Sequence, residues 1–208
     1  KFIFLSTAHV YDNKFQGSIS EKSPTLNRHP YALANLEGER VVRKIFGSSP
    51  EDSLILRLSN IFGFPINKEV DCWNLFINNI CKEIVINQTI TINSNPLIKR
   101  DFISLIDFCE LISRLSDAKF KVRKNNIINF GSEKSISLLE AAKLIKKNYC
   151  SRYQKDVVII FKSEKKIIKD FRFINQFLED NNLNIKFHEN MHIEIKRLIE
   201  QCNKYFVP

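Results

Sequence analysis

The alternation of apolar segments with amphipathic segments is the feature that most constrains how this chain folds. Phe2 to Ser6 and Ser53 to Leu58 are short apolar runs without polar alternation, which is typical of strands buried on both faces. Between them, the residues from Tyr31 to Phe46 follow Pro30 and have the spacing of a helix. The apolar face of this predicted helix contains Leu33, Leu36, Val41 and Ile45. The pattern indicates an α/β fold with a parallel sheet covered on both sides.

The rest of the chain continues the same pattern. Further strands are predicted at Ile84 to Ile92 and Asn126 to Phe130. Further helices are predicted at Cys72 to Cys81, Leu105 to Leu115, Ser137 to Tyr149, Ile167 to Asn181 and Ile193 to Cys202. Two predicted turns are crossing points between two lobes, at Asn93 to Pro96 and Gly131 to Ser135.

Length and composition exclude several classes of protein. A chain of 208 residues with 44% hydrophobic and 26% charged residues fits one ordered domain with or without a small appendage. No apolar run approaches the roughly 18 residues of a membrane span, so we expect no membrane partner. The five cysteines are widely spaced and never form a Cys-x-x-Cys pair. This predicts a reducing, cytoplasmic location without a disulfide framework.

The positive charge is concentrated in one stretch. The chain has 32 Lys and Arg against 23 Asp and Glu, a net charge of +9, and between Lys119 and Arg172 the balance is 15 − 5 = +10. A basic stretch could bind nucleic acid. However, Lys143, Lys146 and Lys147 fall on the polar side of a predicted helix, and a solvated helix face explains them better. We therefore predict no nucleic-acid partner.

Methionine and glycine are both scarce. The one methionine is Met191, so Lys1 is predicted to be an internal position of a longer protein. The five glycines are well under the roughly 7% that is usual in proteins. No two of them are close enough to form a phosphate-binding loop.

Two hydroxyl side chains lie where a parallel sheet binds ligands. Thr7 follows the first predicted strand, and Tyr31 opens the next helix after a polar loop. Ligands bind at the carboxyl ends of strands in open parallel sheets. Each residue by itself is also explained as a helix cap or a packed ring.

Five segments in order resemble the extended short-chain dehydrogenase/reductase family, specifically its NAD-dependent nucleotide-sugar epimerases and dehydratases. They are Phe4-Leu5-Ser6-Thr7-Ala8-His9-Val10-Tyr11, Pro30-Tyr31-Ala32-Leu33-Ala34-Asn35-Leu36-Glu37-Gly38-Glu39, Arg57-Leu58-Ser59-Asn60-Ile61-Phe62-Gly63, Arg100-Asp101-Phe102-Ile103-Ser104-Leu105-Ile106-Asp107 and Asn129-Phe130-Gly131-Ser132. The resemblance covers Phe2 to about Tyr149.

The resemblance implies a partial doubly wound, Rossmann-like parallel sheet with a smaller substrate-binding lobe. Residues 1–65 and 98–132 would form the second half of the NAD-binding domain. Residues 66–97 and 133–208 would form the substrate-binding lobe. The first half, with its glycine-rich loop, would lie upstream of Lys1.

The resemblance also implies roles for individual residues. Tyr31 would be the acid/base on a sugar hydroxyl, and Thr7 would hydrogen-bond the same oxygen. Ser6, Asn35 and Ser59 would lie against the cofactor, which is NAD or alternatively NADP. Asn60 and Arg100 would bind the phosphates of the nucleotide sugar, although a local ion pair between Arg100 and Asp101 is an alternative.

Two departures narrow the predicted reaction. The family has a lysine where this chain has Asn35, and asparagine supplies no charge to favour the tyrosine phenolate. Family dehydratases follow the threonine with Asp-Glu, whereas Ala8-His9 supplies no carboxylate. The sequence therefore favours epimerisation or simple oxidoreduction. The alternative is a non-catalytic sugar-nucleotide-binding or scaffolding relative. Homodimerisation through the helices beginning near Tyr31 and Cys72 is left open.

A second motif competes with this interpretation. His188-Glu189-Asn190-Met191-His192 matches the zinc-protease pattern His-Glu-x-x-His. No Gly-x-x-His follows, and only 208 − 192 = 16 residues remain to supply a third ligand. We expect no metal. Asn184 to Phe187, just before the motif, is predicted as an edge strand or a loop entering a helix.

Overall fold

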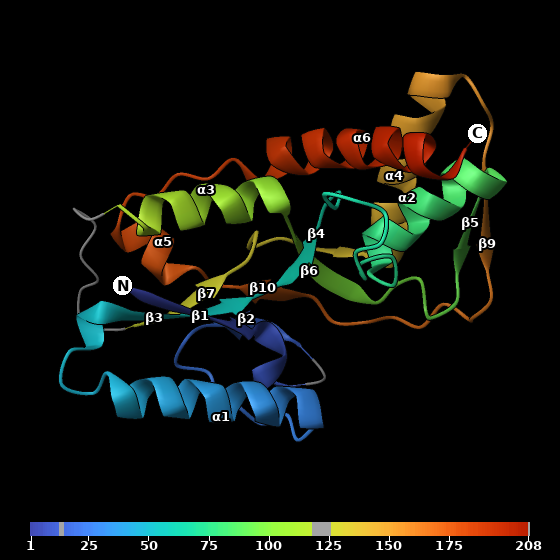
Figure 1. The fold of residues 1–208 in the computed structure, drawn as a ribbon. Helices are drawn as coiled ribbons and strands as arrows, with labels where there is room; N and C mark the ends of the chain where they lie inside the picture. Colours follow the sequence, from blue (N-terminus) through green and yellow to red (C-terminus); the bar gives the residue numbers. More distant parts are fainter. Residues whose placement is uncertain (13–14, 118–125, 208) are drawn as a thin grey trace. The chain divides into compact units, whose positions relative to one another are not determined.

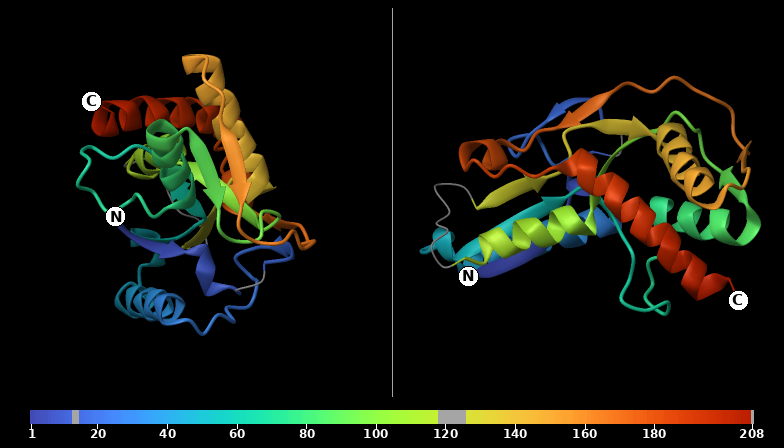
Figure 2. Two further views of the ribbon diagram at one scale, coloured as in Figure 1. Left: turned by 90° about the vertical axis from the view of Figure 1, so that its right-hand side faces the viewer. Right: turned by 90° about the horizontal axis from the view of Figure 1, so that it is seen from above.

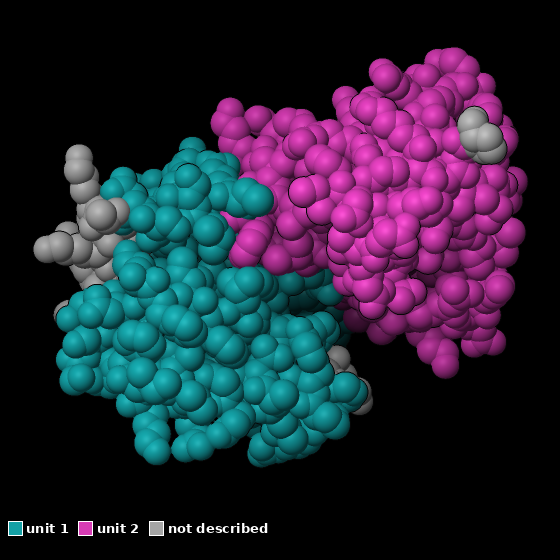
Figure 3. Space-filling view, viewed as in Figure 1, with its two compact units in different colours: residues 1–60, 109–135, 169–185 teal, residues 61–108, 136–168, 186–208 magenta. Residues whose placement is uncertain are grey.

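The computed structural model describes residues 1–12, 15–117 and 126–207. These residues form two compact units, shown in two colours in Figure 3. Unit 1 consists of residues 1–60, 109–135 and 169–185, and unit 2 of residues 61–108, 136–168 and 186–208. We describe each unit by itself.

Unit 1 is built on a three-stranded parallel sheet. Its strands are β1 (Phe2–Thr7), β3 (Ser53–Leu58) and β7 (Ile127–Phe130), in the order β1-β3-β7. Helix α1 (Pro30–Ile45) packs on one face, and residues 109–115 of α3 (Leu105–Leu115) lie over the opposite face (Figures 1 and 2). Short 3-10 helices follow β1 (η1, Ala8–Val10) and precede β3 (η2, Pro50–Asp52). The predicted α/β fold with parallel strands is confirmed.

Helix α1 is not oriented by its largest apolar residues. It buries Ala32, Glu39 and Val42, while Leu33, Val41 and Ile45 of the predicted apolar face are 41%, 42% and 67% exposed. The orientation is explained by Glu39, whose carboxylate is paired beneath the helix with an arginine of β3. Pairing of this kind is what makes burial of a charge tolerable.

A second pair of strands in unit 1 corrects a helix prediction. Strand β2 (Gly17–Ile19) pairs in parallel with β10 (Phe171–Phe173), so the helix predicted over Ile167 to Asn181 is wrong. Only α5 (Gln176–Asp180) is helical there. Phe171 and Phe173 are buried on either side of an exposed Arg172, which is the alternation of a half-buried strand.

Unit 2 combines two small sheets with three packed helices. One sheet, most of whose residues belong to this unit, has the order β4-β6-β8. Its strands are β4 (Asn60–Phe62), β6 (Lys99–Ser104) and β8 (Ser135–Ser137). Strands β5 (Thr89–Ile92) and β9 (Val158–Phe161) pair in parallel. The helices in contact with one another are α2 (Phe76–Asn87), α4 (Leu138–Tyr153) and α6 (Phe187–Phe206).

Several predicted boundaries in unit 2 shift. The strand predicted over Ile84 to Ile92 is half helix, because Ile84 and Val85 lie on the buried face of α2. That helix ends at Gln88, whose φ of 53° is left-handed. Asn184 to Phe187 forms no strand, since Phe187 is the first residue of α6.

The helix predicted over Cys72 to Cys81 is α2, which begins four residues later and ends six residues later than predicted. Helix α3 has the predicted bounds, while α4 and α6 are longer than predicted. Ser137 and Glu140 form a capping box that begins α4. Among the described residues, no helix is both long and apolar enough to span a membrane.

The compact units do not coincide with the predicted functional domains. Strand β6, for example, belongs to unit 2, although residues 98–132 are assigned by resemblance to cofactor binding. Which residues bind cofactor and which bind substrate stays a prediction.

Candidate functional site

Thr7 is the last residue of β1, at the carboxyl end of the parallel sheet. Its backbone is extended, and its Oγ1 accepts a hydrogen bond of 3.2 Å from the His9 amide as the N-cap of η1. The side chain is 6% exposed. The hydroxyl therefore has one fixed partner at the edge where a ligand would approach.

Tyr31 lies in the first turn of α1, which begins at Pro30 as predicted within one residue. The Nδ1 of His29 accepts a 3.3 Å hydrogen bond from the Tyr31 amide and caps the helix. The Tyr31 side chain is 55% exposed. Its ring centroid is 6.4 Å from that of His9, with the rings nearly perpendicular. The structure thus places Tyr31 against the turn that follows Thr7.

Asn35 follows Tyr31 by one helical turn. Its Nδ2 donates a 2.8 Å hydrogen bond to the Tyr31 carbonyl oxygen. The amide group is engaged by its own helix backbone, and it supplies no charge to the tyrosine.

A buried polar network lies among α1, β1 and β3. The Ser6 hydroxyl donates to Glu39 Oε1 at 2.6 Å, and Arg57 donates to both Glu39 oxygens at 2.9 and 2.7 Å. Arg57 also donates to the Tyr11 hydroxyl at 2.9 Å, which in turn donates to Asn129 Oδ1 at 2.5 Å. All five side chains are at most 4% exposed. We call these five residues the buried network.

The charges of the buried network are set by burial and by each other. Burial by itself lowers the pKa of Arg57, but its hydrogen bonds to Glu39 and Tyr11 and the charges of those groups outweigh burial, so the pKa is raised above its usual value. Burial raises the pKa of Tyr11 to about 12, against the opposing effect of Arg57. At neutral pH Tyr11 is therefore a neutral donor and Arg57 a cation.

Ser59 and Asn60 follow β3 at the same carboxyl edge. The Ser59 amide donates to the Phe130 carbonyl at 2.9 Å, which ties the end of β3 to the end of β7. Both residues are partly exposed. Ser6, in contrast, is buried, and its hydroxyl donates a hydrogen bond to Glu39.

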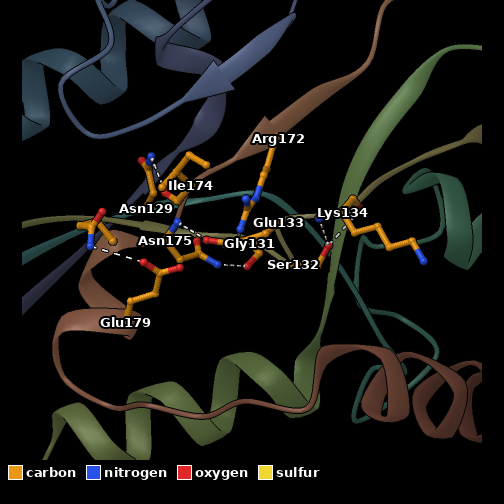
Figure 4. Close-up of polar contacts among 10 residues, drawn as sticks. Asn129, Gly131, Ser132, Glu133, Lys134, Arg172, Ile174, Asn175 and Glu179 are labelled. Carbon is orange, nitrogen blue, oxygen red and sulfur yellow. Dashed lines mark hydrogen bonds and ion pairs between the residues drawn. The ribbon is translucent and has the colours of Figure 1, made fainter.

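The turn after β7 is held by an asparagine from the C-terminal part of unit 1 (Figure 4). Asn175 accepts from the Gly131 amide at 3.0 Å and donates to the Gly131 carbonyl. The Glu133 carboxylate accepts from the Asn175 amide at 2.7 Å and pairs with Arg172. The backbone of Glu133 is left-handed, with a φ of 60°. These contacts fix the turn that the sequence places in the last matching motif.

Arg100 belongs to β6 in unit 2, so the predicted site residues are divided between the two units. Its guanidinium carbon lies 5.8 Å from the centroid of the Phe76 ring. Burial lowers the pKa of Arg100. Within the described residues no ion pair between Arg100 and a carboxylate is found. Whether Arg100 binds phosphate or pairs with Asp101 stays a prediction.

The buried network was not predicted from the sequence. In the sequence, Glu39, Tyr11 and Asn129 belong to the family motifs, but no role is predicted for any of them. The available signal was Arg57, a charged residue inside an otherwise apolar strand, because a buried arginine requires a carboxylate partner.

The His-Glu-x-x-His motif lies on α6, with the rings of His188 and His192 4.8 Å apart between centroids. Among the described residues, no group of three or more His, Cys, Asp or Glu side chains is arranged to hold a metal ion. The motif thus lacks a third ligand there.

Comparisons with known proteins agree with the resemblance. UDP-glucuronic acid 4-epimerase from Bacillus cereus with NAD has a TM-score of 0.73 and 19% sequence identity, over 97% of this chain and 62% of that one. RMD from Pseudomonas aeruginosa with NADPH has a TM-score of 0.74 and 16% identity, over 98% of this chain and 66% of that one. The dTDP-glucose 4,6-dehydratase from Bacillus anthracis with NAD has a TM-score of 0.71 and 14% identity, over 98% of this chain and 62% of that one. The chain thus spans less than two thirds of the length of these proteins.

The comparison with curated proteins found no match. The model of the NAD dependent epimerase/dehydratase family, however, matches residues 1–131, which is more than half of the chain. Together with the parallel sheet and the order of the five motifs, this match identifies the chain as a member of the NAD dependent epimerase/dehydratase family.

Proposed function

We propose that this chain is the C-terminal part of an NAD-dependent nucleotide-sugar epimerase or a related sugar-nucleotide oxidoreductase. Tyr31 exchanges a proton with a sugar hydroxyl, and Thr7 hydrogen-bonds the same oxygen. NAD, when bound, would supply the hydride-transfer chemistry at the sugar carbon.

The observation that carries the proposal is the setting of Tyr31. A half-exposed tyrosine at the start of α1 contacts the turn that directly follows Thr7. The Tyr31 ring packs edge-on against the His9 ring and stays half exposed, and the carboxyl edge of a parallel sheet is where ligands bind in this class of fold. Exposure also leaves the phenol accessible to a substrate oxygen.

The residues proposed for the cofactor fit it unequally. Ser59 is partly exposed just after β3, where it would lie against the cofactor. Asn35 uses one Nδ2 hydrogen for the Tyr31 carbonyl, so a ribose hydroxyl would be bound by its second Nδ2 hydrogen or its Oδ1. Ser6 is 4% exposed and donates to Glu39, so a contact with NAD would use only a lone pair of its oxygen.

An anionic substrate suits Arg100. A half-buried guanidinium without a carboxylate partner among the described residues is a strong partner for phosphate oxygens. Asn60, in unit 1, would also contribute hydrogen bonds to phosphate oxygens of the substrate. These two side chains favour a phosphate-bearing substrate, and the family supports a nucleoside diphosphate sugar as the one we propose.

Turnover of a sugar panel tests the proposal. The complete protein and the 208-residue chain are incubated with NAD and UDP- and dTDP-sugars, and the sugar products are identified by NMR. We expect Tyr31→Phe to abolish turnover and Tyr153→Phe, a tyrosine of α4, to keep it. Equal turnover in Tyr31→Phe and the parent would remove the catalytic assignment.

Asn35 supports the second candidate, a non-catalytic sugar-nucleotide-binding or scaffolding relative. Its side chain is bound to the helix backbone and brings no charge to Tyr31. If the protein is a slow enzyme, Asn35→Lys should raise the rate near neutrality and move a basic pH optimum down, because an ammonium one turn away stabilises phenolate. Binding of a sugar nucleotide without turnover in both the parent and Asn35→Lys would favour the non-catalytic relative.

A further inference from the structure

Asn27 is a buried residue that no motif includes. It lies three residues before Pro30, the first residue of α1, and is 4% exposed. Its side-chain Nδ2 donates a 2.6 Å hydrogen bond to the His9 carbonyl. Its Oδ1 accepts a 2.9 Å hydrogen bond from the His29 amide. One amide side chain thus joins the turn after β1 to the residue that caps α1.

The two joined segments carry the proposed catalytic residues. On one side, the His9 amide donates to Thr7 Oγ1. On the other, His29 Nδ1 accepts from the Tyr31 amide. Thr7, His9, Asn27, His29 and Tyr31 therefore form one continuous series of contacts that ends where the rings of His9 and Tyr31 meet.

The backbone of the same loop is also tied to the strand end. The amides of Leu26 and Asn27 both donate to the Tyr11 carbonyl, at 2.5 and 3.1 Å, and the Tyr11 hydroxyl belongs to the buried network. The loop entering α1 is thus anchored by its backbone as well, and Asn27 adds the contact that reaches His9 and His29. Losing its side chain would remove the contacts to His9 and His29, while the backbone anchors to Tyr11 and the buried network stay intact.

We propose that Asn27 is a positioning residue of the Thr7 and Tyr31 site. Its side-chain amide holds the turn after β1 and the first turn of α1 together, and so sets the phenol of Tyr31 relative to the Thr7 hydroxyl. The inference rests on the proposed function for its catalytic consequence. The positioning itself is a property of this chain and is measured without substrate.

The first test measures the contact between the His9 and Tyr31 rings. The chain has 4 histidines and 5 tyrosines, so labelled rings are assigned with His9→Gln and Tyr31→Phe. We expect a nuclear Overhauser effect between the two rings in the parent and its loss in Asn27→Ala. Amide exchange of His29 should accelerate about 10-fold, which corresponds to the loss of one buried hydrogen bond.

Asn78→Ala is the matched control. Asn78 is a completely buried asparagine of unit 2 that also bridges backbone groups, with both the amide and the carbonyl of Gly63. It should lower stability while leaving the His9 to Tyr31 contact unchanged. A contact of parent intensity in Asn27→Ala would overturn the proposal.

A second variant keeps the test decisive if Asn27→Ala does not fold. Asn27→Asp retains an acceptor for the His29 amide but replaces the donor to the His9 carbonyl with a carboxylate oxygen. We expect the His29 amide to stay protected and the ring contact to weaken. Retention of the ring contact in Asn27→Asp would also overturn the proposal.

Kinetics of the complete protein separate this inference from the proposed function. If turnover is found, Asn27→Ala should lower kcat by up to about 10²-fold with little change in KM, since misplacement of a reacting group affects the chemical step. An unchanged kcat with a lost ring contact would overturn the catalytic consequence. Absence of turnover in the parent would count against the proposed function and leave the ring measurement to decide the positioning.

Discussion

Glu39 in unit 1 and Glu194 in unit 2 are both almost completely buried, yet their surroundings differ. Glu39 receives two hydrogen bonds from Arg57 and one from Ser6. Glu194 accepts one backbone hydrogen bond, from Phe64 at 3.0 Å, and its ion pair with Arg197 is 3.8 Å long. One carboxylate is the centre of a paired network, and the other is buried with weak compensation.

The cores around the two glutamates differ in the same way. Unit 2 buries a large apolar cluster that includes Ile80, Ile84, Ile195 and Leu198. Unit 1 buries the network of Ser6, Glu39, Arg57, Tyr11 and Asn129 below the edge where Thr7 and Tyr31 lie. Hydrogen bonds with fixed directions define geometry more narrowly than apolar contacts do. The difference suits a unit that must hold reacting groups in place.

The largest effect is expected from Arg57→Met. It leaves Glu39 buried without its cation, which costs about 4 kcal/mol of unfolding free energy. Urea denaturation measures the loss. Combining it with Glu39→Gln should recover much of the stability, because no buried charge then remains unpaired. A double variant as unstable as the sum of the single variants would show that the two groups do not interact.

Leu198→Ala is the corresponding change in unit 2. Leu198 is 0% exposed in the apolar cluster, and its truncation should cost about 3 kcal/mol through lost burial and a cavity. Denaturation followed by far-UV circular dichroism gives the value. Ile66 is 90% exposed, so Ile66→Ala is the control. If Leu198→Ala lowers the free energy of unfolding less than Ile66→Ala does, the assignment of Leu198 to an apolar core is wrong.

Tyr11→Phe removes one hydroxyl from the buried network. We expect a loss of about 1 to 2 kcal/mol, because Arg57 and Asn129 each lose a partner. The pH dependence has a definite sign. The pKa of Tyr11 is raised from 10.0 to about 12 in the folded chain, so its contribution is full below pH 10 and is lost as the pH rises toward 12.

The measurement for Tyr11 is the urea midpoint of the parent and the variant between pH 8 and pH 12. The difference between the two should shrink above pH 10. A difference that stays constant over the whole range would mean that Tyr11 ionises as it does in the unfolded chain.

Glu194→Gln should give the smallest effect and the opposite sign. Burial raises the pKa of Glu194, and the Phe64 amide and Arg197 compensate only in part. The folded chain therefore holds this proton more tightly than the unfolded chain, and its stability falls as the pH rises above the usual value of 4.5. The Glu194→Gln variant has no charge at this position, so its free energy of unfolding should increasingly exceed that of the parent as the pH rises above 4.5. A variant less stable than the parent at neutral pH would contradict this assignment.

The sequence predicts correctly those helices and strands whose apolar pattern is set by residues close together in the chain. β3 has the predicted bounds because it is a short, continuous apolar run, and α3 because its apolar residues have a helical period. The residues from 167 to 181 are predicted as a helix from their apolar content, whereas Phe171, Arg172 and Phe173 alternate as in a half-buried strand, which pairs with β2. Pairing between segments about 150 residues apart leaves no local signal.

The candidate site was predictable only in part, for the same reason. Thr7 and Tyr31 follow from a strand end, a helix start and the family motifs, and their segments do meet. The position of Asn27 between them depends on the path of the loop. The orientation of α1 depends on a long-range ion pair between Glu39 and Arg57, which outweighs three apolar side chains of the predicted face.

The most direct test of the account compares two tyrosines of unit 1, Tyr31 and Tyr11, in the complete protein. Unfolding free energy and turnover of a sugar nucleotide are measured together for Tyr31→Phe and Tyr11→Phe. The account predicts that Tyr31→Phe keeps the parent's stability, since its side chain is 55% exposed, and has no turnover. Tyr11→Phe should lose stability and retain part of its turnover. Turnover in Tyr31→Phe, together with parent stability in Tyr11→Phe, would contradict the division of roles between the exposed and the buried tyrosine.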